Sequence, residues 1–319
     1  MQRVRNAGLL ERREGWYVGR IALTLTALVA SIAWLLLVPS FWWQIPNAVF
    51  LAIILGQVGL LGHDAGHRQI STTPWKNAAV GFANNLIVGG SWTWWVHAHD
   101  RHHGRPNELG HDPATNFEFI AMTPDQAESK TGFARFMVRH QAFFLVPLMS
   151  LYSVSLRMDS VRHLIRGPAR HPRFEMGLIA LNALAWIAGL VAVLGAWHAA
   201  IFIVINQLVF GLYVASIFLP NHHGMPVVEP GEKHDFLRHQ VLTARNIAGG
   251  RPTELWFGGL NHQIEHHLFP QAPRANLRAI RKHVREFCDS RGIGYHEAGL
   301  RQSFREVFSS LYEVSAPLR

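Results

Sequence analysis

Residues 21–39 have the sequence IALTLTALVASIAWLLLVP, which contains no charged side chain. At about 1.5 Å per residue, a helix of this length crosses a hydrocarbon core of roughly 30 Å. A second apolar run follows at 46–62, after Trp42 and Trp43, whose indoles suit the headgroup region of a bilayer. These runs predict two membrane-spanning helices, one crossing and one returning.

Two further runs, 177–195 and 199–219, meet the same length criterion and are separated by only a few residues. The apolar stretches 78–91 and 141–156 are short or interrupted by polar side chains, which favours interfacial or re-entrant helices. The chain is therefore predicted to be an all-α integral membrane protein with four transmembrane helices. We expect a single domain over residues 1–319, with its remaining segments forming one cytoplasmic cap.

The distribution of arginine predicts the orientation. Five arginines precede or begin the first run, whereas the connectors near 40–46 and 195–199 contain no Lys or Arg. Positive charge is retained on the cytoplasmic side, so both termini are expected there, with the cytoplasmic membrane of a bacterium as the expected location. The first run begins too late, is too long and lacks a small-residue cleavage site, so we expect a retained span and not a signal peptide.

The segment 274–291 places Leu277, Ile280, Val284 and Phe287 at helical spacing among Arg and Lys residues. This pattern predicts a basic amphipathic helix that lies on the cytoplasmic cap or on the membrane surface.

Composition excludes several classes of protein and site. Cys288 is the single cysteine, so a disulfide framework, a cysteine-ligated zinc site and an iron–sulfur cluster are all excluded. The net charge of +9 suits an anionic membrane surface or an acidic partner protein. Nucleic acid is not an expected partner, because the basic residues interleave with apolar runs of lipid-spanning length.

Seven of the 20 histidines fall into three tight clusters, which share helical spacings of three or four residues. The first cluster is His63 and His67, the second is His99, His102 and His103, and the third is Gln263, His266 and His267. An even number of predicted spans separates the clusters, which places all three at the cytoplasmic face. Asn221 and His222 lie at the same face, at the end of the fourth span.

Eight histidines at one membrane face are too many for a single tetrahedral zinc ion. Two metal ions with about four imidazole ligands each, and with open positions, are the natural partition, and open positions at a redox metal suggest O2 chemistry. Asp64 and Glu265 lie between ligands, where each carboxylate either orients an imidazole or forms a charge on the helix surface. His262 and His223 adjoin the clusters outside the spacing and are expected near the metals or at the surface.

The three clusters follow the HxxxH, HxxHH and [HQ]xxHH patterns, so the sequence resembles the membrane fatty acid desaturase superfamily over nearly its whole length. Within it, residues 258–270, GGLNHQIEHHLFP, resemble the front-end acyl-lipid desaturases, which have Gln at the position of Gln263. Other resembling strings are Gly62 to His67, Trp94-Trp95, and Phe218 to His222 followed by Gly224-Met225-Pro226.

This resemblance implies a centre of two iron ions that uses O2 and two electrons to introduce a cis double bond into the acyl chain of a lipid or acyl thioester. It implies the metal ligands His63, His67, His99, His102, His103, His222, His266 and His267. Gln263 and Asn221 would act beside the metals, directly or through water.

Some front-end relatives carry a fused cytochrome b5 domain with an HPGG motif, and no such string occurs here. The expected electron donor is therefore a separate protein, an acidic ferredoxin with its reductase, attracted by the positive cytoplasmic surface.

Three alternatives stay open at this point. A hydroxylase or ketolase on the same scaffold would share the first hydrogen abstraction. A membrane zinc amide hydrolase would need about three ligands and no reductant. A histidine-rich metal carrier would place polar groups inside its spans, where Asn182, Asn206 and Gln207 are the few candidates.

Overall fold

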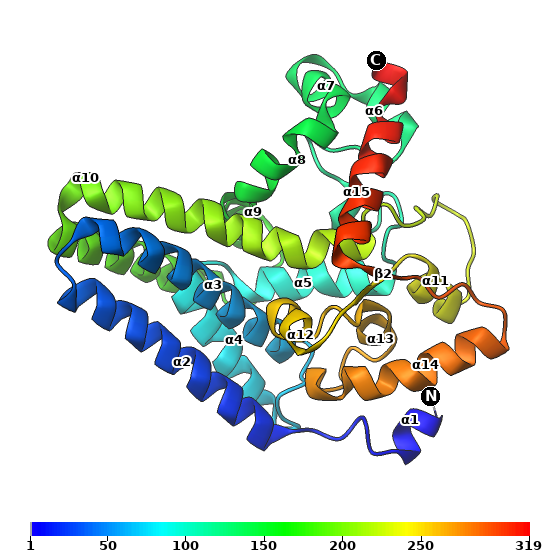
Figure 1. Cartoon of the computed structure of the whole chain (residues 1–319), viewed down its shortest axis with the longest axis horizontal. Helices are drawn as coiled ribbons and strands as arrows, with labels where there is room; N and C mark the ends of the chain where they lie inside the picture. Colours follow the sequence, from blue (N-terminus) through cyan, green and yellow to red (C-terminus); the bar gives the residue numbers. More distant parts are fainter. Residues whose placement is uncertain (1) are drawn as a thin grey trace. The chain divides into compact units, whose positions relative to one another are not determined.

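The computed structural model describes residues 2–319, which divide into two compact units. We call residues 12–96 and 149–215 the apolar unit, and residues 2–11, 97–148 and 216–319 the C-terminal unit. Both are built mainly of helices, as predicted (Figure 1). The single-domain organisation stays a prediction.

The apolar unit contains the long hydrophobic helices. Its elements are α2 (Glu14–Leu37), α3 (Phe41–Gly66), α4 (Pro74–Val88), the start of α5 (Trp92–Gly104), α9 (Tyr152–Arg166) and most of α10 (Pro172–His222). Among residues 2–319, α2, α3 and α10 are long and apolar enough to cross a bilayer. The protein therefore has the helices of a membrane protein.

The C-terminal unit consists of shorter elements and continues α5 and α10 to their ends. Its other elements are α1 (Gln2–Asn6), η1 (Pro113–Thr115), α6 (Pro124–Ser129), α7 (Gly132–Arg139), most of α8 (Gln141–Ser150), α11 (Phe236–Leu242), β1 (Asn246–Ala248), α12 (Arg251–Phe257), α13 (Gln263–Leu268), η2 (Arg274–Asn276), α14 (Leu277–Ser290), β2 (Glu297–Gly299), α15 (Leu300–Val314) and η3 (Ala316–Leu318).

Polar side chains inside the apolar unit pair between helices. Ser31 of α2 donates to Asn47 Oδ1 of α3 at 2.7 Å, and the Asn47 amide donates to the Ser31 carbonyl at 3.1 Å. Asn206 of α10 donates to the carbonyl of Ala48 at 3.0 Å. Such bonds satisfy groups that lipid cannot solvate and fix how neighbouring helices pack.

The helix α10 has 51 residues, and Gly195 interrupts it with φ 75° and ψ 161°. A straight helix of that length would span about 76 Å, more than twice the hydrocarbon core. Glycine adopts this positive φ without a steric penalty, so the chain can break there. The break falls at the end of the predicted run 177–195.

The helix α4 corresponds to the predicted short segment 78–91. Its 15 residues cover only about 22 Å, too few for a full crossing. The carbonyls at its C-terminus are satisfied inside the unit, because Arg157 donates to Val88 O at 2.7 Å and Asn182 donates to Leu86 O and Ile87 O at 2.9 and 3.0 Å. A helix end in an apolar environment needs such partners.

Two predictions differ from the structure in detail. The segment 141–156 forms parts of two helices, α8 and α9, and not one. The C-terminal unit contains the parallel pair β1 and β2, which the all-α prediction omitted. Strands of three residues are too short to show an alternating pattern in the sequence.

Gly211 of α10 provides a test of close helix packing. A Cβ at this position would overlap the backbone carbonyl of Ser150, whereas a Cβ at Gly189 of the same helix would meet open space. We expect Gly211→Ala to destabilise the purified protein by about 1–3 kcal/mol, because a backbone carbonyl cannot move aside cheaply. A thermal unfolding scan in detergent measures this, with Gly189→Ala as the matched control. Equal midpoints for both variants would contradict the packing.

Candidate metal centre

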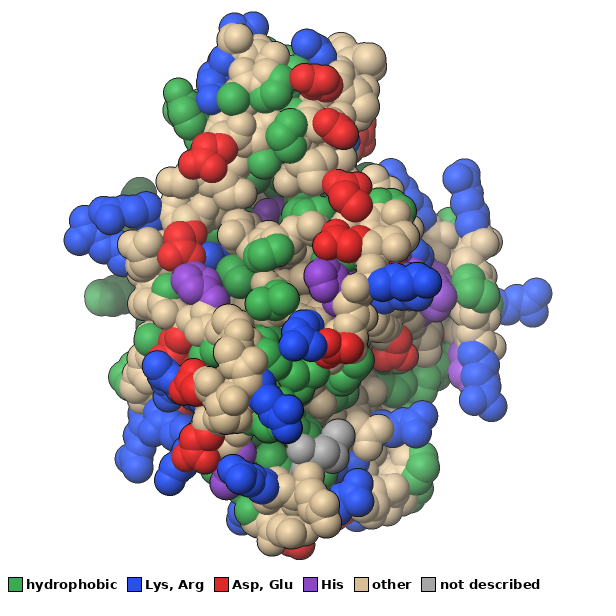
Figure 2. Space-filling model, turned by 90° about the vertical axis from the view of Figure 1, so that its right-hand side faces the viewer, with side chains coloured by type: hydrophobic (Ala, Val, Ile, Leu, Met, Phe, Trp, Pro, Cys, Tyr) green, Lys and Arg blue, Asp and Glu red, His purple; other side chains and the backbone are tan. Residues whose placement is uncertain are grey.

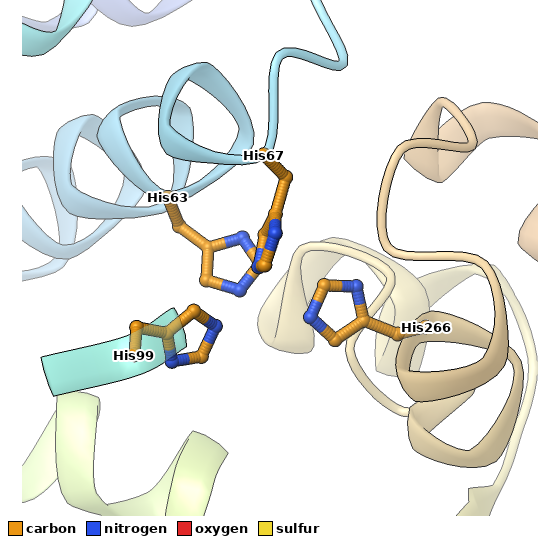
Figure 3. A group of neighbouring side chains, drawn as sticks. All are labelled: His63, His67, His99 and His266. Atoms are coloured by element: carbon orange, nitrogen blue, oxygen red, sulfur yellow. The ribbon is translucent and has the colours of Figure 1, made fainter. Parts of the chain in front are cut away.

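The first histidine cluster lies at the end of α3 in the apolar unit. His63 and His67, which Figure 3 shows at the end of α3, are one turn apart and buried. Their ring centroids are 4.8 Å apart. Asp64 Oδ1 lies 3.2 Å from His63 Nδ1, so this buried carboxylate orients the imidazole, one of the two roles considered for it. Trp95 packs against His63, with 5.1 Å between the ring centroids. Trp95 also covers Gly66, where a Cβ would overlap the indole.

The start of the helix that carries the second cluster is fixed by a buried carboxylate. Glu175 of α10 accepts hydrogen bonds from Ser91 Oγ at 2.8 Å, from the backbone N–H of Thr93 at 3.2 Å and from the Thr93 hydroxyl. A negative charge at a helix N-terminus is favourable because of the helix dipole. Glu175 therefore holds the first turn of α5, whose last residue is Gly104, directly after His103.

Residues of the third cluster lie on α13, whose six residues are all buried. Figure 3 shows His266 projecting from this helix. Gly258 and Gly259 precede it at φ 58° and 83°, in the turn that leads into the cluster. Asn246 of β1 accepts a hydrogen bond from the backbone N–H of Ile264 at 2.9 Å, which fixes the first turn of α13 to the small sheet.

Within the C-terminal unit, His102, His222 and His267 come together from α5, α10 and α13. Their potential ligand nitrogens lie within 4.8 Å of one another, and His102 Nε2 lies 3.3 Å from His222 Nε2. Sequence analysis predicted all three as ligands. The structure brings them into one group although 165 positions separate the first from the last.

Each of these three imidazoles has an acceptor at Nδ1. Asp112 Oδ2 lies 2.8 Å from His102 Nδ1, the Thr243 carbonyl lies 3.0 Å from His222 Nδ1, and Gln240 Oε1 lies 2.8 Å from His267 Nδ1. A proton held on Nδ1 leaves the Nε2 lone pair available, which is how histidine ligands are usually oriented. The three residues are therefore arranged to bind a metal through Nε2.

Three other histidines of this unit form a second group. His103 Nε2 lies 3.0 Å from His99 Nε2 and 3.1 Å from His266 Nε2. Two nitrogens bound at about 2.0–2.1 Å to a tetrahedral ion lie roughly 3.3 Å apart, so this spacing is close to that of metal ligands. The donor set, imidazole nitrogen in both groups, fits iron as well as zinc or copper.

The electrostatic environment favours a charged carboxylate behind His102. Burial alone would raise the pKa of Asp112, but the neighbouring His102 and the backbone N–H groups of Ala114 and Asn107 hold that pKa below its usual range. Asn107 also ties this loop to the end of α10, because its amide donates to His222 O at 3.1 Å. Asp112 is therefore an anion fixed from several sides.

Gln263 and Asn221 are adjacent but differ in their contacts. The Gln263 amide lies 3.0 Å from His222 Nε2, whereas Asn221 donates to Gln263 Oε1 at 3.0 Å and to Leu260 O at 3.1 Å. Asn221 thus holds the amide of Gln263 beside a ligand nitrogen. His262 is buried, and its Nε2 lies 3.1 Å from Glu254 Oε1.

Comparison with known proteins agrees with this centre. The family model "Fatty acid desaturase" matches residues 40–299. The chain belongs to the fatty acid desaturase family.

Characterised relatives in this family include front-end enzymes. The chain is 28% identical over 313 residues to the acyl-lipid (9-3)-desaturase of Physcomitrium patens, covering 94% of this chain and 59% of that protein. It is 29% identical over 306 residues to the Delta(8)-fatty-acid desaturase of Helianthus annuus, covering 91% and 66%. It is 26% identical over 314 residues to the Delta(6)-fatty-acid desaturase of Caenorhabditis elegans, covering 92% and 69%. The chain thus spans about three fifths to two thirds of these relatives.

Sequence reasoning about the desaturase motifs missed the groups that orient His102, His222 and His267. Asp112 follows the second cluster by nine residues. In the sequence it stands before Pro113, a pair that indicates the N-cap of a helix and not a contact with histidine. Gln240 lies in no motif. Glu265 is buried, so a surface role is wrong, and its carboxyl group accepts hydrogen bonds from Asn246 and Tyr295.

Asp112→Asn tests the orienting role. The amide can donate to His102 Nδ1 in place of accepting, so the required tautomer is no longer selected. We expect metal affinity to fall about 10- to 100-fold, measured by competition with a chelator and elemental analysis. Asp125→Asn, an exposed aspartate on α6, is the matched control. Unchanged metal retention in Asp112→Asn would exclude this role.

Proposed function

We propose that the protein is an O2-dependent acyl-lipid desaturase in which the eight histidines predicted as ligands hold two iron ions. The observation that carries this proposal is the convergence of His102, His222 and His267, each with Nδ1 occupied by an acceptor. Family membership and the names of the relatives, all acyl-lipid or fatty-acid desaturases, support the same chemistry.

Two metal ions account for the whole set of predicted ligands. His102, His222 and His267 would serve one ion, and His99, His103 and His266 would serve the other. His63 and His67 of the apolar unit stay predicted ligands. Gln263 lies beside His222 and would act at an open position of the first ion, with Asn221 as its positioning residue.

The bound iron would supply the oxidising power that an unactivated methylene group requires. Two hydrogen atoms leave adjacent carbons of the acyl chain, and together with O2, two electrons and two protons they yield a double bond and two water molecules. The residues of this chain bind and orient. Asp112, Thr243 and Gln240 keep three imidazoles in the ligating tautomer, and Trp95 covers the first cluster.

The membrane arrangement fits an acyl substrate. We propose four crossings, with α2 and α3 as two and α10 as two more on either side of Gly195. Both termini and the histidine clusters would then face the cytoplasm, in the cytoplasmic membrane of a bacterium. An acyl lipid or acyl thioester would enter from the bilayer with its chain alongside apolar helices.

The variant His266→Ala/His267→Ala tests the function. Without one ligand from each histidine group, we expect the purified protein to lose most of its bound iron and cells expressing it to lose the new unsaturated acyl species. Elemental mass spectrometry and lipid profiling measure these effects. His171→Ala, an exposed histidine outside the clusters, should behave like the wild type.

Other products would point elsewhere. An acyl product that gains one oxygen atom would indicate a hydroxylase, and a further oxidation to a carbonyl would indicate a ketolase. One zinc ion per chain with release of free fatty acid would indicate an amide hydrolase.

The electrons would come from a separate acidic protein, a ferredoxin reduced by a flavoprotein reductase. The net charge of +9 supports this choice, since opposite charges accelerate encounter. In a reconstituted assay, the rate at limiting ferredoxin should fall steeply as salt screens these charges. A rate indifferent to salt would exclude an electrostatic encounter.

A further inference from the structure

The helix α14 lies directly on the helix that carries the third histidine cluster. Its buried residues Leu277, Ile280, Val284 and Cys288 share one hydrophobic core with Ile264 and Leu268 of α13. The sequence pattern predicted this helix, with one correction, because Phe287 is 44% exposed and Cys288 takes the inward position. The inner face of α14 is therefore fully used in packing.

The outer face of α14 is basic. Residues 277–291 contain five Lys or Arg side chains and the two carboxylates of Glu286 and Asp289. Two further carboxylates lie against this helix, because Glu254 pairs with Arg278 and Glu297 pairs with Arg281 and Arg285, so a smaller excess of positive charge remains. Arg278, Lys282 and Arg285 are exposed. Figure 2 shows many Lys and Arg side chains on this side of the molecule.

The N-terminal helix α1 extends this basic surface. Val4 is buried in the same core as α14, and the Asn276 amide donates to Leu9 O at 2.9 Å. These contacts leave Arg3 and Arg5 exposed next to α14. We call Arg3, Arg5, Arg278, Lys282 and Arg285 the basic surface.

A short path connects the basic surface to a predicted metal ligand. The guanidinium of Arg285 lies 5.9 Å from the ring centroid of Tyr295, which is partly exposed. The Tyr295 hydroxyl donates to Glu265 Oε1 at 2.8 Å, and Glu265 is bonded through the peptide chain to His266. One hydrogen bond and otherwise covalent bonds thus link a surface ring to the third cluster.

The burial of α14 argues against a lipid surface as its partner. An amphipathic helix binds a bilayer by inserting its apolar face, and here that face is occupied by α13 and the surrounding core. The side chains of α14 that remain exposed are mostly charged, together with the ring of Phe287, and such a surface suits an acidic protein partner.

We propose that the basic surface of α14 and α1 is the docking site of an acidic one-electron carrier protein that reduces the metal centre. This inference rests on the proposed desaturase function, because only a redox centre needs such a donor. The position follows from two features together, the excess of positive charge and the direct packing of α14 on a helix that carries metal ligands.

The test uses the full-length protein in neutral-lipid nanodiscs, with a plant-type [2Fe–2S] ferredoxin as the probe. Lys282→Glu/Arg285→Glu reverses two charges on α14. We expect the ferredoxin Kd and the KM for ferredoxin to rise about ten-fold or more at low ionic strength, and less at high salt. The kcat at saturating ferredoxin and the iron content should stay unchanged. The neutral pair Lys282→Gln/Arg285→Gln should give an intermediate effect.

The matched control is Arg301→Glu/Arg305→Glu, which makes the same charge change at two exposed positions of α15. Its ferredoxin Kd should stay near that of the wild type. An equal loss of binding in both charge-reversed variants would show a general effect of net charge and overturn the proposal. Unchanged ferredoxin binding in the α14 variant, or wild-type protein that does not bind ferredoxin at low salt, would overturn it as well.

Binding and catalysis separate this proposal from the proposed function. Loss of ferredoxin binding in the α14 variant alone, with wild-type protein that forms no unsaturated product, would support the docking site and contradict desaturation. Loss of binding to anionic vesicles in the α14 variant, with ferredoxin binding intact, would assign the surface to lipid and overturn the proposal.

Discussion

The hydrogen bond at Nδ1 of His102, His222 and His267 is the constraint on which their arrangement depends. A neutral imidazole has one lone pair, and the acceptor at Nδ1 decides that this lone pair lies on Nε2. Asp112, Thr243 and Gln240 supply these acceptors from three separate segments. The loop after α5 and the segment that includes α11 must therefore fold correctly before the histidines can ligate.

Glu175 and Arg157 each hold a helix end in the apolar unit, and both contacts reflect the cost of burying polar groups. Glu175 is fully buried and uses its charge to hold the N-terminus of α5. Arg157 is partly buried in the same unit and uses its guanidinium to satisfy the C-terminus of α4. Each charge lies at the helix end whose partial charge has the opposite sign, so the helix dipole offsets part of the cost of removing the charge from water.

Local patterns determined how much could be predicted from the sequence. The spacing of His63 and His67, or of His99 and His103, fixes one face of a helix, and the structure forms those helices. The contact of Asp112 with His102 depends on the turn through Gly104, Pro106 and Asn107, and the pairing of Gln240 with His267 spans two helices. No periodicity records such contacts, so the histidine clusters and Asp64 were predictable from motifs while Asp112 and Gln240 were not.

The chemical character of the donors explains why the carboxylates near the histidines matter. Imidazole ligands are neutral, so they do not offset the charge of two bound cations, and a buried cation without a nearby anion is costly. Asp64 contacts His63 and Asp112 contacts His102, so each places a negative charge one imidazole away from a ligand nitrogen. Glu265 differs, because burial raises its pKa to about 7 and its carboxyl group bonds to Tyr295 and Asn246. The first two carboxylates would therefore offset the charge of the proposed metal ions, whereas Glu265 fastens α13 to β1 and Tyr295.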